Sequence, residues 1–470
     1  MKNLIKKFIP DFILYWYHWK MAVLGALIYG FPSKKLIVIG VTGTKGKTTT
    51  CNLIAQILNG AGLKTGMATT VNFRIGEKEW VNESKMTMLG RFGLQKLLRQ
   101  MVREGCKYAV IETSSEGILQ HRHRFIDYSV AVFTNLSPEH IERHGSFEKY
   151  REAKLKLFEA VARKKNGTGV YNLDDENAGH FLEIPVAKRY GYSLNLPQPL
   201  LKEGGSLPLG RVREDFRQFQ ISNIKLSPSK TEFDFDNAHF EMPLIGEFNV
   251  FNVAAAICVG VSQGIDPNKI KEILKNVKST PGRLEVVDCG QPFTVIVDYA
   301  HEPASLEAVY KAIKVFNPRK IIAVLGAQGG GRDKRKRPEL GRIAGEYADT
   351  IIVTNEDPYD ESPEQIIEDV AAGVAPPCHP GLDPGSRCRP CESRDQNLDS
   401  RFRGDDRKCE IFKIVDRKEA IKKALSLAET GDVVILTGKG GEVWMCVENG
   451  KKIPWNERKI VEEELAKLRP

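Results

Sequence analysis

A glycine-rich segment near the start of the chain constrains its fold more than any other feature. The apolar run Leu36–Val41 predicts a buried parallel strand, and a helical pattern follows over Cys51–Asn59. Between them, the sequence Gly-Thr-Lys-Gly-Lys-Thr at 43–48 can turn backbone N–H groups toward an anion, while Lys47 adds a cation and the Thr48 hydroxyl can reach a magnesium ion. The standard spacing would need glycine in place of Val41, so this is a shortened variant. The segment predicts an ATP site; the alternative is an ordinary turn that carries glycines.

Composition and charge narrow the class of protein. A chain of 470 residues with 41% hydrophobic and 27% charged residues is typical of a soluble protein with two or three domains. The net charge of +9 is spread along the chain except for one cluster at Arg332–Arg337, which fits anionic small substrates at least as well as nucleic acid. Nine cysteines without framework spacing indicate reduced thiols in a cytoplasmic enzyme.

The first 35 residues are rich in aromatic and aliphatic side chains. Asp11, His18 and Lys20 interrupt them, and the clean apolar run Met21–Phe31 is too short to cross a bilayer. Two interpretations remain. One is a helix packed on the body of the protein or on a partner, and the other is an interfacial helix lying on the inner membrane surface.

From Leu36 to about Lys278, apolar strands alternate with amphipathic helices. The segments 108–112 and 130–135 are expected strands, and a helix is expected over 94–104, before the first of them. This alternation predicts a doubly wound, mostly parallel α/β sheet. Polar residues follow both strands, including Glu112 and His140, at the edge where ligands collect. They suit magnesium or polar substrate contacts, although either residue alone could be a strand-end cap.

Several motifs carry a family resemblance. The segments 43–48, Glu-Thr-Ser-Ser-Glu-Gly-Ile-Leu-Gln-His-Arg at 112–122, Thr-Asn-Leu-Ser-Pro-Glu-His at 134–140 and Tyr-Arg-Glu-Ala-Lys at 150–154 resemble the Mur ligases, most closely their tripeptide-forming branch. The resemblance implies an ATP-dependent amide ligase of peptidoglycan synthesis. In such an enzyme ATP phosphorylates the carboxylate of a UDP-muramyl-dipeptide acceptor, and an amino acid's amine attacks the acyl phosphate.

The resemblance also implies roles for individual residues. The residues implied in catalysis are Lys47, Glu112, His140 and Lys154, and those around Mg²⁺ are Thr48, Glu112, His140 and Lys154, the last as a carbamate. The residues implied in ATP binding are Gly43, Thr44, Lys45, Gly46, Lys47, Thr48, Thr49, Asn249, Asn252, Arg283, Asp298, His301, Asp333 and Lys336. The residues implied for the acceptor and the incoming amino acid are Thr87, Ser114, Gln120, Arg122, Asp357, Tyr359, Gly438 and Glu442. Asn249 could equally be a helix N-cap, and Arg337 is a further expected phosphate contact.

The sequence departs from the family pattern at several positions, among them Met88, which follows Thr87 where the family often has a second threonine. Glu116 and Gly441 stand where the family has histidine, and Glu139 stands where it has aspartate. Tyr359 occupies the place of an arginine that holds the distal carboxylate in diaminopimelate-adding enzymes, and a phenol cannot form that bidentate pair. The identity of the amino acid therefore stays open.

Three segments are expected. Residues 1–35 precede a central ATP-binding domain at 36–279, which includes short strands near 216–221 and 231–235, and a C-terminal Rossmann-like α/β domain at 280–470. An insert at 375–408 has the composition of a disordered loop. Its Cys388 and Cys391 permit a zinc site, although the further cysteine and histidine residues nearby are irregularly spaced. Because 35 residues cannot form the uridine-binding domain usual in the family, we expect an altered way of holding the UDP end or a different carrier.

Two rival functions remain at this point. A folylpolyglutamate synthase-like ligase also carries its phosphate loop near the start of the chain. A non-catalytic nucleotide-binding partner, attached to a membrane through residues 1–35, is the rival of another class. For the ligase we expect a monomer that binds small molecules and no nucleic acid.

Overall fold

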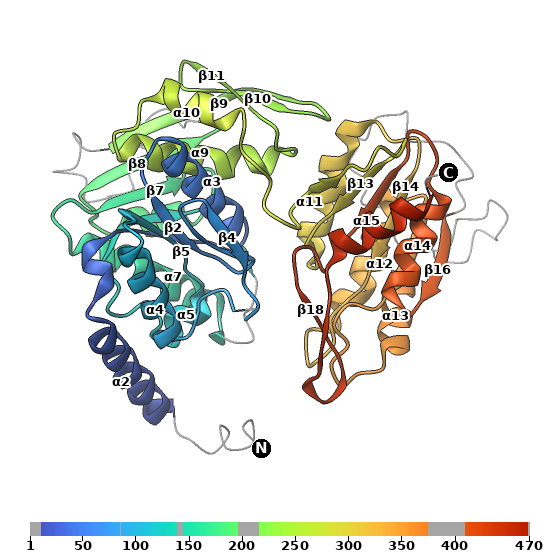
Figure 1. Ribbon diagram of the computed structural model, residues 1–470, viewed down its shortest axis with the longest axis horizontal. Coiled ribbons are helices and arrows are strands. Elements are labelled where there is room, and N and C mark those ends of the chain that lie inside the picture. The colour runs from blue at the N-terminus through green and yellow to red at the C-terminus, as the bar shows by residue number, and fades with distance from the viewer. Residues whose placement is uncertain (1–10, 85, 139–143, 196–215, 375–408, 469–470) are drawn as a thin grey trace, which may run out of the picture. The chain divides into compact units, whose positions relative to one another are not determined.

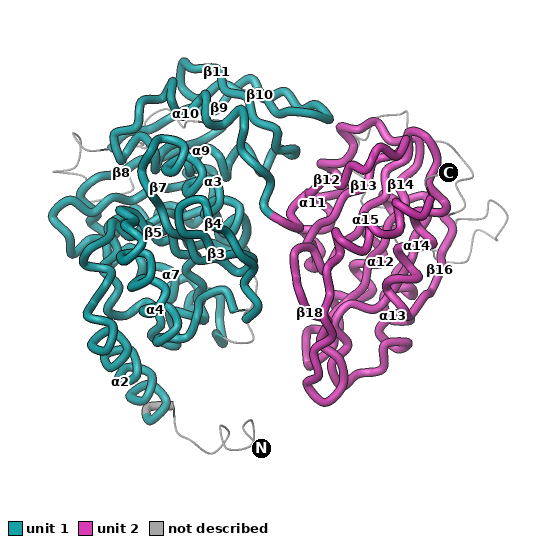
Figure 2. The backbone as a smooth tube through the Cα atoms, in the orientation of Figure 1, with its two compact units in different colours: residues 1–280 teal, residues 281–470 magenta. Residues whose placement is uncertain are grey.

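The computed structural model describes residues 11–84, 86–138, 144–195, 216–374 and 409–468. It forms two compact units, Met1–Thr280 and Pro281–Pro470 (Figure 2). His140 and the insert 375–408 with its cysteines lie outside the described residues, so the predictions about them stay predictions.

Unit 1 is built on one large sheet with strand order β11-β10-β9-β8-β7-β6-β1-β5-β2-β3-β4 (Figure 1). Its strands are β1 (Ile37–Thr42), β2 (Thr65–Ala68), β3 (Asn72–Ile75), β4 (Lys78–Val81), β5 (Tyr108–Glu112), β6 (Tyr128–Phe133), β7 (Thr168–Asn172), β8 (Lys188–Ser193), β9 (Phe216–Leu226), β10 (Thr231–Phe235) and β11 (Ala238–Met242). In this spatial order, the seven central strands from β9 across to β2 are parallel to one another. The strands β10 and β11 at one edge and β3 and β4 at the other are added by antiparallel pairing. The short strands expected near 216 and 231 thus extend the main sheet.

Helices cover both faces of this sheet. They are α2 (Asp11–Tyr29), α3 (Lys47–Gly60), α4 (Arg91–Arg103), α5 (Ser115–Leu119), α7 (Phe147–Ala162), α8 (Ala178–Leu182), α9 (Glu247–Ser262) and α10 (Pro267–Leu274), with a 3₁₀ turn, η1 (Pro32–Lys35). Alternate residues of β5 enter opposite cores: Val110 packs with α3 and α9, and Ile111 packs with α4, α7 and α8. This period of two explains why the central strands read as continuous apolar runs.

Unit 2 has a second sheet with strand order β12-β13-β17-β14-β15-β16, parallel except for β12. Its strands are β12 (Glu285–Val287), β13 (Thr294–Val297), β14 (Ile321–Leu325), β15 (Thr350–Thr354), β16 (Glu410–Ile414) and β17 (Val433–Leu436), and β18 (Trp444–Cys446) pairs with β19 (Lys452–Pro454). Its helices are α11 (Pro303–Ile313), α12 (Lys336–Tyr347), α13 (Pro363–Ala371), α14 (Arg417–Leu427) and α15 (Glu457–Leu468), with the 3₁₀ turns η2 (Lys314–Phe316) and η4 (Glu448–Gly450). One core packs under α11–α13 and another under α14 and α15.

The predicted fold class is confirmed, because both sheets are mostly parallel and covered by helices on both faces. The parallel arrangement directs the loops after β1, β5 and β6 to one edge of the first sheet, and those after β13, β17, β14 and β15 to one edge of the second. Ligands of open α/β sheets bind at such edges. In the part of the chain that the structure describes, no helix is both long enough and apolar enough to cross a membrane.

Candidate active site

The loop after β1 has the geometry of a phosphate-binding loop. Gly43 and Gly46 have φ values of +151° and +79°, which glycine adopts without strain. A Cβ on Gly43 would lie 1.9 Å from Thr134 Oγ1, and one on Gly46 would lie 2.2 Å from Asn252 Oδ1. The α3 helix begins at Lys47, so the N–H groups of its first turn and its positive dipole end face the loop.

Side chains from two other segments hold this loop in place. Thr44 Oγ1 lies 3.1 Å from the Tyr150 hydroxyl, and the Lys45 N–H donates to Asn135 Oδ1 at 2.8 Å. Lys47 Nζ donates to Thr44 O at 2.8 Å, which folds the lysine back over the loop. Thr49 is half-buried in the first turn of α3. The predicted loop residues therefore form one preorganised cradle whose shape suits an anion.

Thr48 and Glu112 make the strongest case for magnesium. Thr48 Oγ1 donates to Glu112 Oε2 at 2.9 Å, the Thr70 N–H donates to the same oxygen at 2.8 Å, and both Thr48 and Glu112 are buried. Hydroxyl and carboxylate oxygens are ligands that Mg²⁺ accepts, and Mg²⁺ takes few protein ligands because it keeps waters and phosphate oxygens. Within the described ranges, no group of three or more His, Cys, Asp or Glu residues could hold a metal ion.

Lys154 lies on α7 directly beneath the loop. Only 1% of it is exposed, its Nζ donates to Gly43 O at 2.6 Å, and the same nitrogen lies 4.4 Å from the centre of the Tyr150 ring. The sequence alone showed Lys154 as one lysine of a charged helix. The tertiary structure brings its amine to the backbone of the phosphate loop.

Asn249 and Asn252 lie on the buried face of α9, which packs against α3. Asn249 Nδ2 donates to Ile245 O at 2.7 Å, so this side chain does not act as the N-cap; Gly246 occupies that position. Asn252 donates to Asn249 Oδ1 and accepts from Thr50 Oγ1 at 3.3 Å. In this structure Asn252 therefore supports the phosphate loop from behind.

The predicted acceptor residues gather after β5. Ser114 caps α5 by accepting from Gly117 N, and Gln120 Oε1 accepts from the Arg122 guanidinium at 2.7 Å. Arg122 also donates to Met88 O, next to Thr87, whose Oγ1 accepts from Thr70 at 3.1 Å. Burial lowers the pKa of Arg122. These residues and Glu112 share one edge of the sheet.

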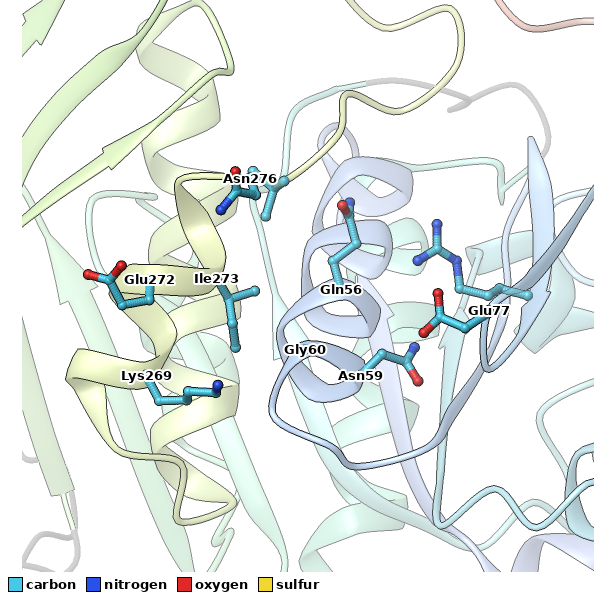
Figure 3. Close-up of a pocket in the computed structure, with 10 residues that line it drawn as sticks. Gln56, Asn59, Gly60, Glu77, Lys269, Glu272, Ile273 and Asn276 are labelled. Atoms are coloured by element: carbon cyan, nitrogen blue, oxygen red, sulfur yellow. The ribbon is translucent and has the colours of Figure 1, made fainter.

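A hollow of about 380 Å³ opens elsewhere on unit 1, between α3, α10 and the β3–β4 hairpin (Figure 3). Gln56, Asn59 and Gly60 line it from the C-terminal end of α3, whereas the phosphate loop lies at the N-terminal end. The two ends of this 14-residue helix are about 20 Å apart, so this hollow is separate from the candidate phosphate site.

In unit 2, the residues after β13 form a tight polar turn. Buried Asp298 accepts from the N–H groups of Leu284 and Ala300 at 2.7 Å each, and burial raises its pKa against the opposing effect of Arg283. The Arg283 guanidinium lies 4.4 Å from the Tyr299 ring centre. His301 Nδ1–H donates to Tyr299 O at 2.9 Å. Burial lowers the pKa of His301, and the positive charge of Lys336 lowers it further.

The basic cluster at 332–337 divides into separate environments. Lys336 Nζ donates to Glu302 Oε1 at 2.6 Å and lies beside His301. Asp333 lies at the surface, paired with Arg335. Arg337 is buried, with ion pairs at 2.9 Å to Glu361 and to Asp369, so its charge is already matched inside unit 2.

A buried acidic cluster lies at the carboxyl ends of β15 and β17. Lys439 Nζ donates to Asp357 Oδ1 at 2.9 Å, to Glu442 Oε2 at 2.6 Å and to Trp444 O at 2.8 Å. Tyr359 has a left-handed backbone (φ +53°), and its ring covers Gly330. Gly438 (φ +102°) approaches so closely that a Cβ there would lie 2.5 Å from Glu356 Oε2.

Glu356 is the residue of this cluster that the sequence did not single out. It is fully buried, neither carboxylate oxygen has a hydrogen-bond partner among the described residues, and burial raises its pKa to about 7. The available signal was the polar run Asn-Glu-Asp directly after the apolar strand at 350–354. Only the fold reveals that its carboxylate lacks a partner.

The comparisons with known proteins agree with this geometry. Residues 41–260 match the Mur ligase middle domain, and residues 282–440 match the Mur ligase, glutamate ligase domain. The UDP-N-acetylmuramoyl-L-alanyl-D-glutamate–2,6-diaminopimelate ligase of Syntrophomonas wolfei is 34% identical over 444 residues, covering 94% of this chain and 81% of the relative.

Two solved structures have the same fold. A UDP-N-acetylmuramoyl-L-alanyl-D-glutamate–2,6-diaminopimelate ligase matches with a TM-score of 0.58 and 28% identity, covering 93% of this chain and 79% of the other. Folylpolyglutamate synthase from Mycobacterium tuberculosis matches with a TM-score of 0.62, covering 89% and 92%, but at 16% identity this likeness shows the fold alone. The chain belongs to the Mur ligase family and is an ATP-dependent ligase whose reaction uses Mg²⁺.

Proposed function

We propose that the protein joins an amino acid to UDP-N-acetylmuramoyl-L-alanyl-D-glutamate in peptidoglycan synthesis. The names of its relatives support this acceptor. The structural observation that carries the proposal is the assembly of the phosphate loop, the Thr48–Glu112 pair and buried Lys154 at one sheet edge, next to Arg122. A cytoplasmic location and a monomeric state stay predictions.

The proposed reaction has two steps. An acceptor carboxylate oxygen attacks the γ-phosphorus of ATP, ADP leaves, and an acyl phosphate forms. The incoming amine then attacks the acyl carbon, phosphate leaves, and the amine loses a proton. Here the loop amides and Lys47 would hold the phosphates in line, and bound magnesium would neutralise charge on their oxygens, with Thr48 and Glu112 as its protein ligands.

We also propose that Lys154 is carbamylated. An amine and CO₂ form a carbamate with loss of one proton, which converts a cation into an anion able to bind a second magnesium. The position of Lys154 supports this, because its Nζ lies at the backbone of the phosphate loop, 2.6 Å from Gly43 O. Lys154→Ala should abolish turnover and a short carboxylic acid should restore part of it; equal activity with and without that acid would contradict the carbamate.

We further propose that the cluster of Glu356, Asp357 and Glu442 receives the incoming amino acid. Lys439 is paired with two carboxylates, Asp357 and Glu442, so one negative charge is left over for an ammonium group even while Glu356 is neutral. The unpartnered oxygens of Glu356 are available to a ligand donor. An amino acid with a second amine therefore suits the cluster better than one that adds a carboxylate beside Tyr359.

A substrate panel tests the proposed function. Phosphate release is measured with ATP, UDP-muramyl-dipeptide and a series of amino acids, and in parallel with a folate acceptor. We expect turnover only with the muramyl acceptor. Turnover with the folate would favour the folylpolyglutamate synthase-like alternative, and tight ATP binding without turnover on any acceptor would favour a non-catalytic partner.

A further inference from the structure

The α2 helix turns its small residues toward the protein and a row of large apolar residues toward solvent, the reverse of an ordinary surface helix. Small residues at 22, 25 and 26 face the body of unit 1, and Gly25 approaches the backbone of Arg91 on α4 so closely that a Cβ there would lie 3.4 Å from Arg91 O. Six large apolar side chains point away from the protein instead, whereas Tyr15 and Trp19 contact the rings of His121 and Phe125. The exposed fractions lie between 45% and 60% for Ile13, Trp16, Tyr17, Leu24, Leu27 and Ile28.

These exposed residues form one continuous stripe. At 100° per residue, all six and Lys20 fall within a sector about 120° wide, and the stripe extends about 22 Å along the helix from residue 13 to residue 28. Figure 1 shows α2 at the periphery of unit 1. An apolar surface of this extent on a soluble protein marks an interaction site.

The charge around the stripe identifies its partner. No acidic residue occurs between positions 12 and 76. Lys20 lies within the stripe, Lys34 and Lys35 are exposed just beyond its C-terminal end, and α4 has exposed Lys96 and Arg103 and no acidic residue. This charge complements anionic lipid headgroups, whose surface potential attracts such cations.

We propose that the exposed stripe of α2 binds the surface of an anionic lipid bilayer, with the helix lying in the interface. Trp16 and Tyr17 combine an apolar ring with a polar group, which suits the headgroup level, while the aliphatic residues enter the acyl boundary. A second copy of the chain is a poorer occupant, because a two-fold interface would bring the same lysines against one another. This inference does not depend on the proposed substrates.

Vesicle flotation tests this proposal with the full chain. We expect recovery with vesicles of phosphatidylglycerol and phosphatidylcholine, at least tenfold less with phosphatidylcholine alone, and a steep fall in high salt. Leu24→Gln/Leu27→Gln/Ile28→Gln should lose at least tenfold of the binding, as should Lys34→Glu/Lys35→Glu. The matched control, Val286→Gln/Ile411→Gln/Ile453→Gln, removes similarly exposed apolar side chains from unit 2 and should bind as the wild type does.

Circular dichroism verifies that each variant is folded, and Trp16→Ser/Tyr17→Ser replaces the triple variant if that variant does not fold. Undiminished binding by the stripe variants would overturn the proposal. So would equal binding to neutral and anionic vesicles. Absence of vesicle binding, together with a dimer that the stripe variant dissociates, would assign the stripe to a second copy instead.

Discussion

Glu356 should make unit 2 less stable at alkaline than at acidic pH. Burial raises the pKa of its carboxyl from 4.5 to about 7, so between these pH values the folded state retains a proton that the unfolded state loses. This contribution to stability is complete below pH 4.5 and is lost as the pH rises to 7, and the shift corresponds to about 3 kcal/mol. The Glu356→Gln variant should therefore have the same free energy of unfolding as the wild type at pH 4.5 and a higher one above pH 7.

Urea unfolding at several pH values measures this difference. Asp333→Asn is the control, because Asp333 lies at the surface and its pKa is lowered by Arg335 instead. If the difference in the free energy of unfolding between Glu356→Gln and the wild type does not widen as the pH rises, Glu356 is not neutral in the folded state.

Tyr359→Arg should shift amino-acid preference toward diaminopimelate. Tyr359 is at the turn after Asp357, beside the proposed ammonium cluster, and a guanidinium there could pair with a distal carboxylate. Hydrogen bonds to charged groups contribute about 1.5–3 kcal/mol, so the kcat/KM ratio of diaminopimelate to lysine should rise about 10- to 100-fold. Steady-state kinetics with both amino acids decides this, and an unchanged ratio would place the distal group elsewhere.

At the scale of elements, the β1–loop–α3 unit depends on Gly46. Gly46→Ala should abolish nucleotide binding, because a methyl group would strike Asn252 Oδ1 at 2.2 Å and displace the start of α3. Gly62→Ala is the matched control: Gly62 has a similar φ of +84° but open space around its Cβ. Calorimetric titration with an ATP analogue should show binding to the second variant only; binding by both would mean that the loop adapts.

The elements also show where pattern reading succeeds. The strands at 108–112 and 130–135 were predicted to within two residues, because their apolar runs and polar boundaries are local properties. The strands near 216 and 231 were predicted as short strands, but the prediction did not say that they pair into the main sheet. Strand pairing is a long-range choice that local sequence does not encode.

At the scale of the whole molecule, two units with separate cores should unfold separately. Ile54 lies in a core of unit 1 and Ile435 in a core of unit 2, and each is fully buried. Replacing a buried isoleucine with alanine costs about 2–5 kcal/mol. In scanning calorimetry, Ile54→Ala should lower one transition and Ile435→Ala the other. A single transition that both variants lower equally would show one cooperative unit.

The sequence by itself determined the phosphate loop, the α/β fold class and the family, because glycine spacing, apolar runs and motif order are properties of contiguous residues. Only the tertiary structure decided which charges meet. It brought Lys154 to Gly43, buried Arg337 among carboxylates, left Glu356 without a partner and turned the large side chains of α2 outward. Burial and pairing depend on segments far apart in the chain, so no local pattern could reveal them.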